Sequence, residues 1–158
     1  KFTLRNFAIG FGQKDVGQYL DVRETASIFG AAMLVPRKVL DEVGPMDDIY
    51  FLYYEEHDWA ARIKKAGYKI FYDGRSLVLH KESISTVRES PFQIYYLHRG
   101  RVLFLRRNIV GISKLFSLLY HYTVVLTVNT MRFILKGRAD LAKAFIKAMY
   151  WNLVNPCR

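Results

Sequence analysis

The sequence predicts an α/β domain followed by a helical extension, on three observations. Strand-like and helix-like patterns alternate between residues 28 and 80, an order that favours an α/β layer over a helical bundle. Of the 158 residues, 51% are hydrophobic and 15% aromatic, which is enough for a buried core. Residues 1–98 hold 13 basic and 13 acidic residues, whereas residues 99–158 hold 11 basic residues and Asp140 alone. This shift predicts a boundary near residue 98, between a charge-balanced domain and a basic, apolar tail.

The first predicted elements are a strand and a short helix. IFGAAMLV, residues 28–35, is a short apolar run typical of a buried strand. Its small residues Gly30, Ala31 and Ala32 indicate that something approaches this backbone closely. PRKVLDEVG, residues 36–44, then predicts a helix with proline in its first turn and glycine at its end.

An acidic cluster follows in FLYYEEHDWAARIKKAG, residues 51–67. Glu55, Glu56 and Asp58 are expected in the first turn of a helix that ends at the glycine. Two interpretations compete at this point. Carboxylates favour the positive end of a helix dipole, and an arginine four residues after Asp58 adds an ordinary helix-stabilising pair. Alternatively, one of the carboxylates is catalytic.

YKIFYDGRSLVLH, residues 68–80, predicts two strands joined by an Asp73-Gly74 turn. This arrangement places His80 at the end of an apolar strand. An imidazole there is either a hydrogen-bonded structural histidine or a ligand.

The tail is predicted to be helical from Tyr95. Leu115–Leu135 is mostly apolar and long enough to span a membrane. However, Ser117, His121 and Arg132 fall on one side of a helical wheel. We therefore favour an amphipathic helix that lies on a membrane or packs on the domain over a spanning helix. DLAKAFIKAMYWNLV repeats the same design near the end of the chain.

Composition restricts the compartment and the partners. Cys157 is the single cysteine, which excludes a disulfide framework or a cysteine-based metal site within the chain and favours a reducing, cytoplasmic setting. No signal-peptide pattern opens the sequence. The net charge of +10 does not indicate nucleic-acid binding, because the basic residues alternate with long aliphatic runs. An anionic membrane surface is the expected partner of the tail.

Four motifs in order resemble the C-terminal half of family 2 glycosyltransferases, especially bacterial rhamnosyltransferase-like members. They are GAAML, EVGPMDDIYFLYYEEHDW, AGYKIFYDGRSLVLHKES and YYLHRGRVLFLRRN, within about residues 17–108. The resemblance implies an inverting enzyme that uses nucleotide-sugar donors. It also implies the C-terminal portion of a GT-A fold, here followed by basic amphipathic helices.

The resemblance also implies roles for the acidic cluster. The family's acidic motif matches Tyr54, Glu55 and Glu56, so Glu56 is the expected general base, with Glu where the family usually has Asp. Glu55 is expected to position the acceptor or the loop. Tyr54, Asp58 and Trp59 are expected to contact the acceptor.

Two further sites follow from the same resemblance. The family's small-residue loop on the acceptor side matches Gly30, Ala31 and Ala32, and its C-terminal histidine matches His80. His80 would help to hold a divalent cation, Mg²⁺ or Mn²⁺, at the leaving diphosphate. The family's donor site carries an Asp-x-Asp motif, and no such motif occurs in these 158 residues. We therefore expect a fragment that lacks the donor-binding half, does not retain the cation and is inactive alone.

The expected function is transfer of a sugar from a nucleotide-sugar donor to a glycan or lipid-linked acceptor in cell-surface polysaccharide synthesis. The expected location is cytoplasmic, peripheral to the inner face of the cell membrane. The alternative is a non-enzymatic module that binds a membrane or a partner through residues 99–158.

Overall fold

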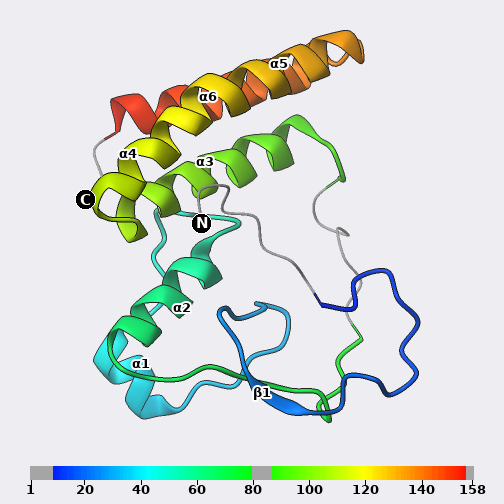
Figure 1. The fold of residues 1–158 in the computed structure, drawn as a ribbon, viewed down its shortest axis with the longest axis vertical. Coiled ribbons are helices and arrows are strands. Elements are labelled where there is room, and N and C mark those ends of the chain that lie inside the picture. The colour runs from blue at the N-terminus through cyan, green and yellow to red at the C-terminus, as the bar shows by residue number, and fades with distance from the viewer. Residues whose placement is uncertain (1–8, 80–86, 156–158) are drawn as a thin grey trace. The chain divides into compact units, whose positions relative to one another are not determined.

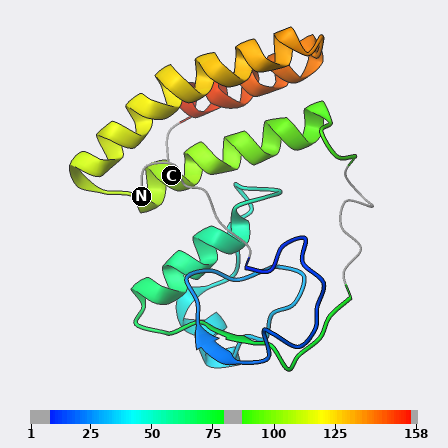
Figure 2. The ribbon, with the colours of Figure 1, turned by 45° about the vertical axis from the view of Figure 1, so that its right-hand side comes forward.

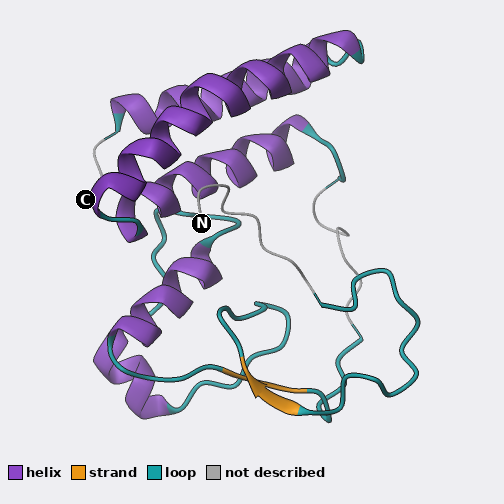
Figure 3. Ribbon diagram, in the orientation of Figure 1, coloured by secondary structure: helices purple, strands orange, loops and turns teal. Residues whose placement is uncertain are grey.

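The computed structural model describes residues 9–79 and 87–155, which fall into two compact units. Residues 9–46 and 56–79 belong to one, here called the mixed unit. Residues 47–55 belong with 87–155 to the other, here called the helical unit. Figure 3 shows the strands in the former and the long helices in the latter.

The mixed unit contains a two-stranded antiparallel sheet. Strand β1, Val22–Glu24, pairs with β2, Phe71–Asp73. The predicted strand at residues 28–35 is wrong: this segment is a loop with a tight turn, in which the Ala32 N–H donates to the Phe29 carbonyl oxygen at 3.2 Å. A buried strand needs neighbours for its backbone groups, and neither β1 nor β2 pairs with this segment.

The hairpin predicted across the Asp73-Gly74 turn is also wrong in its second half. The turn forms, and the Ser76 N–H donates to the Asp73 carbonyl oxygen at 3.2 Å. Residues 75–79 are not a strand, however, and β2 pairs with the distant β1 instead. His80 lies outside the described residues.

The two helices predicted in this part of the chain are confirmed. Helix α1, Arg37–Val43, follows Pro36 and ends before Gly44. Helix α2, Glu55–Lys65, begins with the acidic cluster. The core of the mixed unit joins them through Val39, Trp59 and Ile63.

The helical unit consists of long helices side by side (Figures 1 and 2). The helix that begins at residue 91 and the last helix of the chain run in one direction, and the helical run 111–135 runs in the opposite direction. The unit contains α3 (Pro91–Asn108), α4 (Gly111–Tyr120), the π-helical turn η1 (His121–Val125), α5 (Leu126–Leu135) and α6 (Ala139–Val154). Its main core consists of Ile94, Val102, Leu141, Phe145 and Met149. Ser90 caps α3 by accepting the Gln93 N–H at 3.2 Å, with proline next in the chain.

The predicted apolar helix at Leu115–Leu135 is confirmed as part of a continuous run from Gly111 to Leu135. In the described part of the chain, this run alone is long and apolar enough to cross a membrane, a criterion of length and composition that is weak evidence by itself. Only 11% of its apolar window is buried.

The change in charge composition at residue 98 falls inside a helix and not between two elements. Helix α3, Pro91–Asn108, continues through residue 98, and the compact units divide the chain elsewhere. The predicted domains 1–98 and 99–158 therefore stay a prediction from charge.

Replacing Gly100 with alanine is expected to destabilise the helical unit. A Cβ at this position would lie 2.7 Å from the Tyr53 carbonyl oxygen, so the backbone before α2 would have to move. Such overpacking costs about 1–3 kcal/mol, which exceeds the roughly 1 kcal/mol that alanine contributes to a helix interior. Urea denaturation should show a net loss of stability. Gly30→Ala is the matched control, because its nearest atom, the Met33 Cε, is 4.0 Å away. Equal or greater stability of Gly100→Ala would contradict the packing seen here.

His98 is expected to make the helical unit sensitive to acid. Burial, the nearby Arg101 charge and His121 together lower the pKa of His98 to about 3. The unfolded chain binds this proton near pH 6.5, so stability falls as pH falls from about 6.5 towards 3 and is independent of this group above that window. Denaturation series should give a slope of up to roughly 1.4 kcal/mol per pH unit, reduced in His98→Gln. An unchanged slope in the variant would refute the assignment.

Candidate active site

The loop that leads into α2 has an unusual backbone. Phe51, Tyr53 and Tyr54 have φ angles of 63°, 63° and 72°, in the left-handed region that bulky residues seldom adopt. Such conformations each cost about 1–3 kcal/mol and persist only where the surroundings impose them. The contacts that impose them come from α3.

Arg99 holds the first part of this loop. Its guanidinium donates hydrogen bonds to the carbonyl oxygens of Ile49 and Tyr50, the latter at 2.9 Å. It also stacks over Tyr96, with 4.9 Å from Cζ to the ring centroid, and over Trp151 at 4.6 Å. A planar guanidinium can make in-plane hydrogen bonds and face contacts together, which an ammonium cannot.

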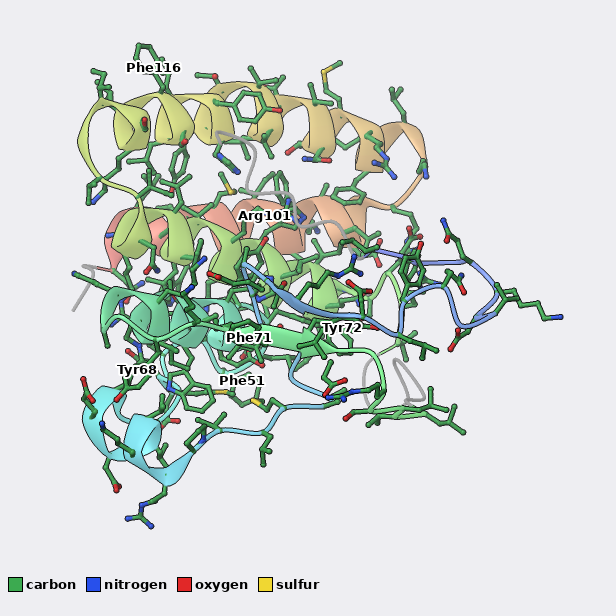
Figure 4. All side chains as sticks on the ribbon, turned by 60° about the horizontal axis from the view of Figure 1, so that its bottom comes forward. Phe51, Tyr68, Phe71, Tyr72, Arg101 and Phe116 are labelled. Carbon is green, nitrogen blue, oxygen red and sulfur yellow. The ribbon has the colours of Figure 1, made fainter. Side chains whose placement is uncertain are left out.

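Two more arginines of α3 hold the ends of the loop. Arg101 donates from Nε to the Tyr54 hydroxyl oxygen at 2.8 Å. Arg107 donates to the Asp47 carboxylate at 2.7 Å. Together with Arg99, they connect α3 to the eight residues before α2, here called the strapped loop (residues 47–54). The position of Arg101 on α3 is shown in Figure 4.

Glu55 and Glu56 follow the strapped loop directly and begin the first turn of α2. The boundary between the two compact units falls between these residues. The Glu56 side chain is 18% exposed, and its Oε1 lies 3.3 Å from the His57 Nδ1. Burial raises the pKa of Glu56, but hydrogen bonds from His57 and the backbone and the His57 charge outweigh it, so the pKa lies below 4.5. The carboxylate is therefore ionised at neutral pH and able to accept a proton.

Asp58 and Trp59 are used for structure. The buried Asp58 carboxylate accepts from Arg62 Nε at 3.1 Å, and Arg62 also donates to the Val43 and Pro45 carbonyl oxygens. The Trp59 indole N–H donates to the Gly44 carbonyl oxygen at 2.8 Å. The predicted helix-bracing pair is confirmed, whereas the predicted acceptor contacts of these buried side chains stay a prediction.

The small-residue segment lies between Ile28 and Val35, which both pack against the core of the mixed unit. Gly30, Ala31 and Ala32 form an exposed turn rather than the predicted strand. The nearest neighbour of a Cβ at position 30 would be a methionine methyl group 4.0 Å away. The structure thus leaves this backbone open, and its predicted role in acceptor binding stays a prediction.

No metal site is found in the described residues. Within 9–79 and 87–155, no three His, Cys, Asp or Glu side chains are grouped as cation ligands. The predicted metal ligand His80 lies outside these residues. Within the described ranges, therefore, no group of side chains fits a divalent cation, and we derive no step through one.

Sequence reasoning missed an exposed aromatic patch that the strapped loop forms with α3. The Phe51 side chain is 65% exposed, and its ring lies 4.8 Å from the Tyr96 ring and 6.4 Å from the Phe92 ring. Flat exposed rings can stack on a sugar face. Aromatic residues at 51 and 92 are visible in the sequence, but nothing in it shows that a left-handed turn brings them together.

The sequence prediction counted the arginines of α3 in the basic tail that was expected to face a membrane. The structure shows that Arg99, Arg101 and Arg107 bind the strapped loop, and that Arg106 donates to the Asn152 and Asn155 carbonyl oxygens. These four charges are therefore engaged within the helical unit. The sequence shows that these arginines lie on one helix. It does not show their hydrogen-bond partners, which are about fifty residues away in the chain.

Comparison with known proteins gives partial matches. Two strains of Mycobacterium tuberculosis have an N-acetylglucosaminyl-diphospho-decaprenol L-rhamnosyltransferase that is 32% identical over 83 residues, covering 52% of this chain and 27% of the relative. A low-salt glycan biosynthesis hexosyltransferase of Haloferax volcanii is 27% identical over 75 residues, covering 47% of this chain and 24% of the relative. No family model and no solved structure matches.

The matched stretch spans about a quarter of the length of these relatives. At this level the predicted resemblance is confirmed: the chain is similar to glycosyltransferases, which supports glycosyl transfer in glycan synthesis as its general kind of function. The observed mixture of helices with a small sheet is compatible with an α/β fold.

Proposed function

We propose that this chain is the acceptor-side part of an inverting, family 2 glycosyltransferase with a GT-A fold, and that Glu56 is its general base. The observation that carries the proposal is the position of Glu56 in the first turn of α2, directly after a strained loop that contacts from α3 hold in place. Strain of this kind is concentrated at functional sites. The partial similarity to glycosyltransferases supports the same reaction class.

In the proposed reaction, the Glu56 carboxylate takes the proton of an acceptor hydroxyl. The hydroxyl oxygen attacks the anomeric carbon of the donor sugar from the face opposite the diphosphate. A carbon–oxygen bond forms as the bond to the diphosphate breaks, and the nucleoside diphosphate leaves with the electron pair. Glu55, held at the end of the strapped loop, positions the acceptor.

We further propose that the donor-binding half lies outside this chain, which contains no Asp-x-Asp motif. A divalent cation at the diphosphate would then be held mainly by that half. The acceptor is a lipid-linked saccharide, on the ground that the mycobacterial relatives are described as acting with a diphospho-decaprenol. Such an acceptor places the enzyme at the inner face of the cell membrane.

The test compares this chain with the complete protein that contains it. The complete protein should transfer a labelled sugar from a nucleotide donor to a diphospho-polyprenol saccharide. Calorimetry on the 158-residue chain alone should show no tight donor binding. Micromolar binding of a nucleotide sugar by the chain alone would contradict the proposal that the donor-binding half lies outside it. Absence of sugar transfer by the complete protein across a panel of nucleotide sugars would contradict the proposed function.

A non-enzymatic binding module is the second candidate. The exposed apolar side chains of α4 and α5 favour it, because such surfaces mark interaction sites. Absence of sugar transfer by the complete protein, together with binding to a membrane or a protein partner, would support this alternative.

A further inference from the structure

One side of the long helix 111–135 exposes a row of apolar side chains. Phe116, for example, projects to the side of α4 away from α3 (Figure 4). We call this row the outer stripe. Its members are 47–83% exposed: Ile112, Leu115, Phe116, Leu119, Val124, Val128, Met131, Ile134 and Leu135. A helix on a soluble protein shows the opposite pattern, with apolar residues inside.

The inner side of the same helix is partly polar. Ser117 and His121 are each 1% exposed, and the His121 Nδ1 lies 2.8 Å from the Ser117 carbonyl oxygen. The Tyr122 hydroxyl donates to the Met149 carbonyl oxygen of α6 at 3.1 Å. The predicted polar side of this helix therefore faces α3 and α6 at these positions, and the apolar side chains of the outer stripe are exposed.

The π-helical turn keeps the outer stripe on one side. In η1 the Leu126 N–H donates to the His121 carbonyl oxygen, five residues back. A turn of this kind inserts one residue, which rotates the following helix by about 100°. Without the insertion, Val128, Met131 and Leu135 would turn away from the direction of Ile112 and Leu119. The insertion brings both halves of the stripe into register.

The charges on helix 111–135 and α6 indicate what binds to the outer stripe. Lys114, Arg132 and Lys136 on this helix form no ion pair with any carboxylate in the described ranges, and neither do Lys143 and Lys147 on α6. An exposed apolar stripe on a pair of helices whose basic residues lack ion pairs among the described residues fits an anionic lipid surface. A second copy of this chain would bring the same positive charges together, which is unfavourable.

We infer that the outer stripe is a membrane-docking face, on which helix 111–135 lies in the interface of an anionic bilayer. A spanning orientation is disfavoured because α6 packs alongside α5 and would carry the exposed Lys143 and Lys147 into the hydrocarbon. The inference deepens the proposed membrane location, but its test requires no transferase activity.

The test is flotation of the chain with vesicles of equal parts phosphatidylglycerol and phosphatidylcholine. Leu119→Glu with Val128→Glu should reduce the floated fraction at least ten-fold, because two charges would enter the apolar boundary. Ser76→Glu with Ala26→Glu is the control of equal charge on exposed positions of the mixed unit, and it should float like the unchanged chain. Circular dichroism verifies that all variants are folded.

Vesicles of phosphatidylcholine alone should bind the chain less, and salt should weaken binding to the anionic vesicles. Equal flotation of the stripe variant and the unchanged chain would overturn the inference. It would also be overturned if the unchanged chain stayed unbound while sedimentation showed a dimer that the stripe variant lost, because the occupant would then be a second copy.

Discussion

Glu56→Gln in the complete protein is expected to lower kcat for sugar transfer by about 10²–10⁴, the range that general-base catalysis contributes. Glutamine keeps the size and polarity of the side chain but cannot accept the acceptor proton. Since the amide can still receive hydrogen bonds, the KM values for donor and acceptor should change little. Steady-state kinetics with a lipid-linked acceptor measure both quantities.

The matched control for this prediction is Asp41→Asn, which removes an exposed carboxylate of α1 that pairs with Arg37. It should retain wild-type kcat. A Glu56→Gln enzyme with kcat within two- to three-fold of wild type would contradict the assignment of the base.

Arg99→Leu is expected to destabilise the helical unit by about 3 kcal/mol, by the usual cost of lost charged hydrogen bonds and cation–π contacts. The substitution leaves the Ile49 and Tyr50 carbonyl oxygens without their guanidinium donor. It also removes the cation from between the Tyr96 and Trp151 rings. The strapped loop should then relax out of its left-handed conformation.

Arg99→Lys should lie between leucine and wild type, because lysine keeps the charge but not the planar fork. Arg88→Leu is the control, since Arg88 is an exposed arginine just before α3. Urea denaturation monitored by tryptophan fluorescence should separate the three variants. If Arg99→Leu were as stable as Arg88→Leu, the loop would be held by other contacts.

The parts of the fold that the sequence predicts are those with local signals. Proline and glycine bracket α1, and the acidic first turn marks the start of α2. In both cases the residues that decide the structure are neighbours in the chain. The prediction of a strand at residues 28–35 was wrong because an apolar run carries no information about whether a partner strand is present.

The candidate site was predictable only in part, for a similar reason. The pattern of Tyr54, Glu55 and Glu56 pointed to the correct helix start. The left-handed backbone before it is formed by aromatic residues that give no local indication of positive φ. It depends on Arg99 and Arg101, whose partners lie 47 to 50 positions away. Tertiary contacts of this range are not encoded in any window of sequence.

The orientation of helix 111–135 shows the limit of periodicity. The pattern correctly predicted a helix with Ser117 and His121 on one side, but Arg132, which the same pattern placed with them, is exposed. Periodicity could not show that this polar side is covered by α3 and α6, nor that the π-helical turn corrects the register of the apolar side. Which side is exposed depends on what packs against it.

The most direct test of the central claim is the anomeric configuration of the product, measured by proton NMR on sugar transferred by the complete protein. A carboxylate acting as a base on the acceptor predicts a single displacement, and therefore a product of configuration opposite to that of the donor. Retention of the donor configuration would require two successive displacements or attack from the face of the departing diphosphate, and would contradict the role proposed for Glu56.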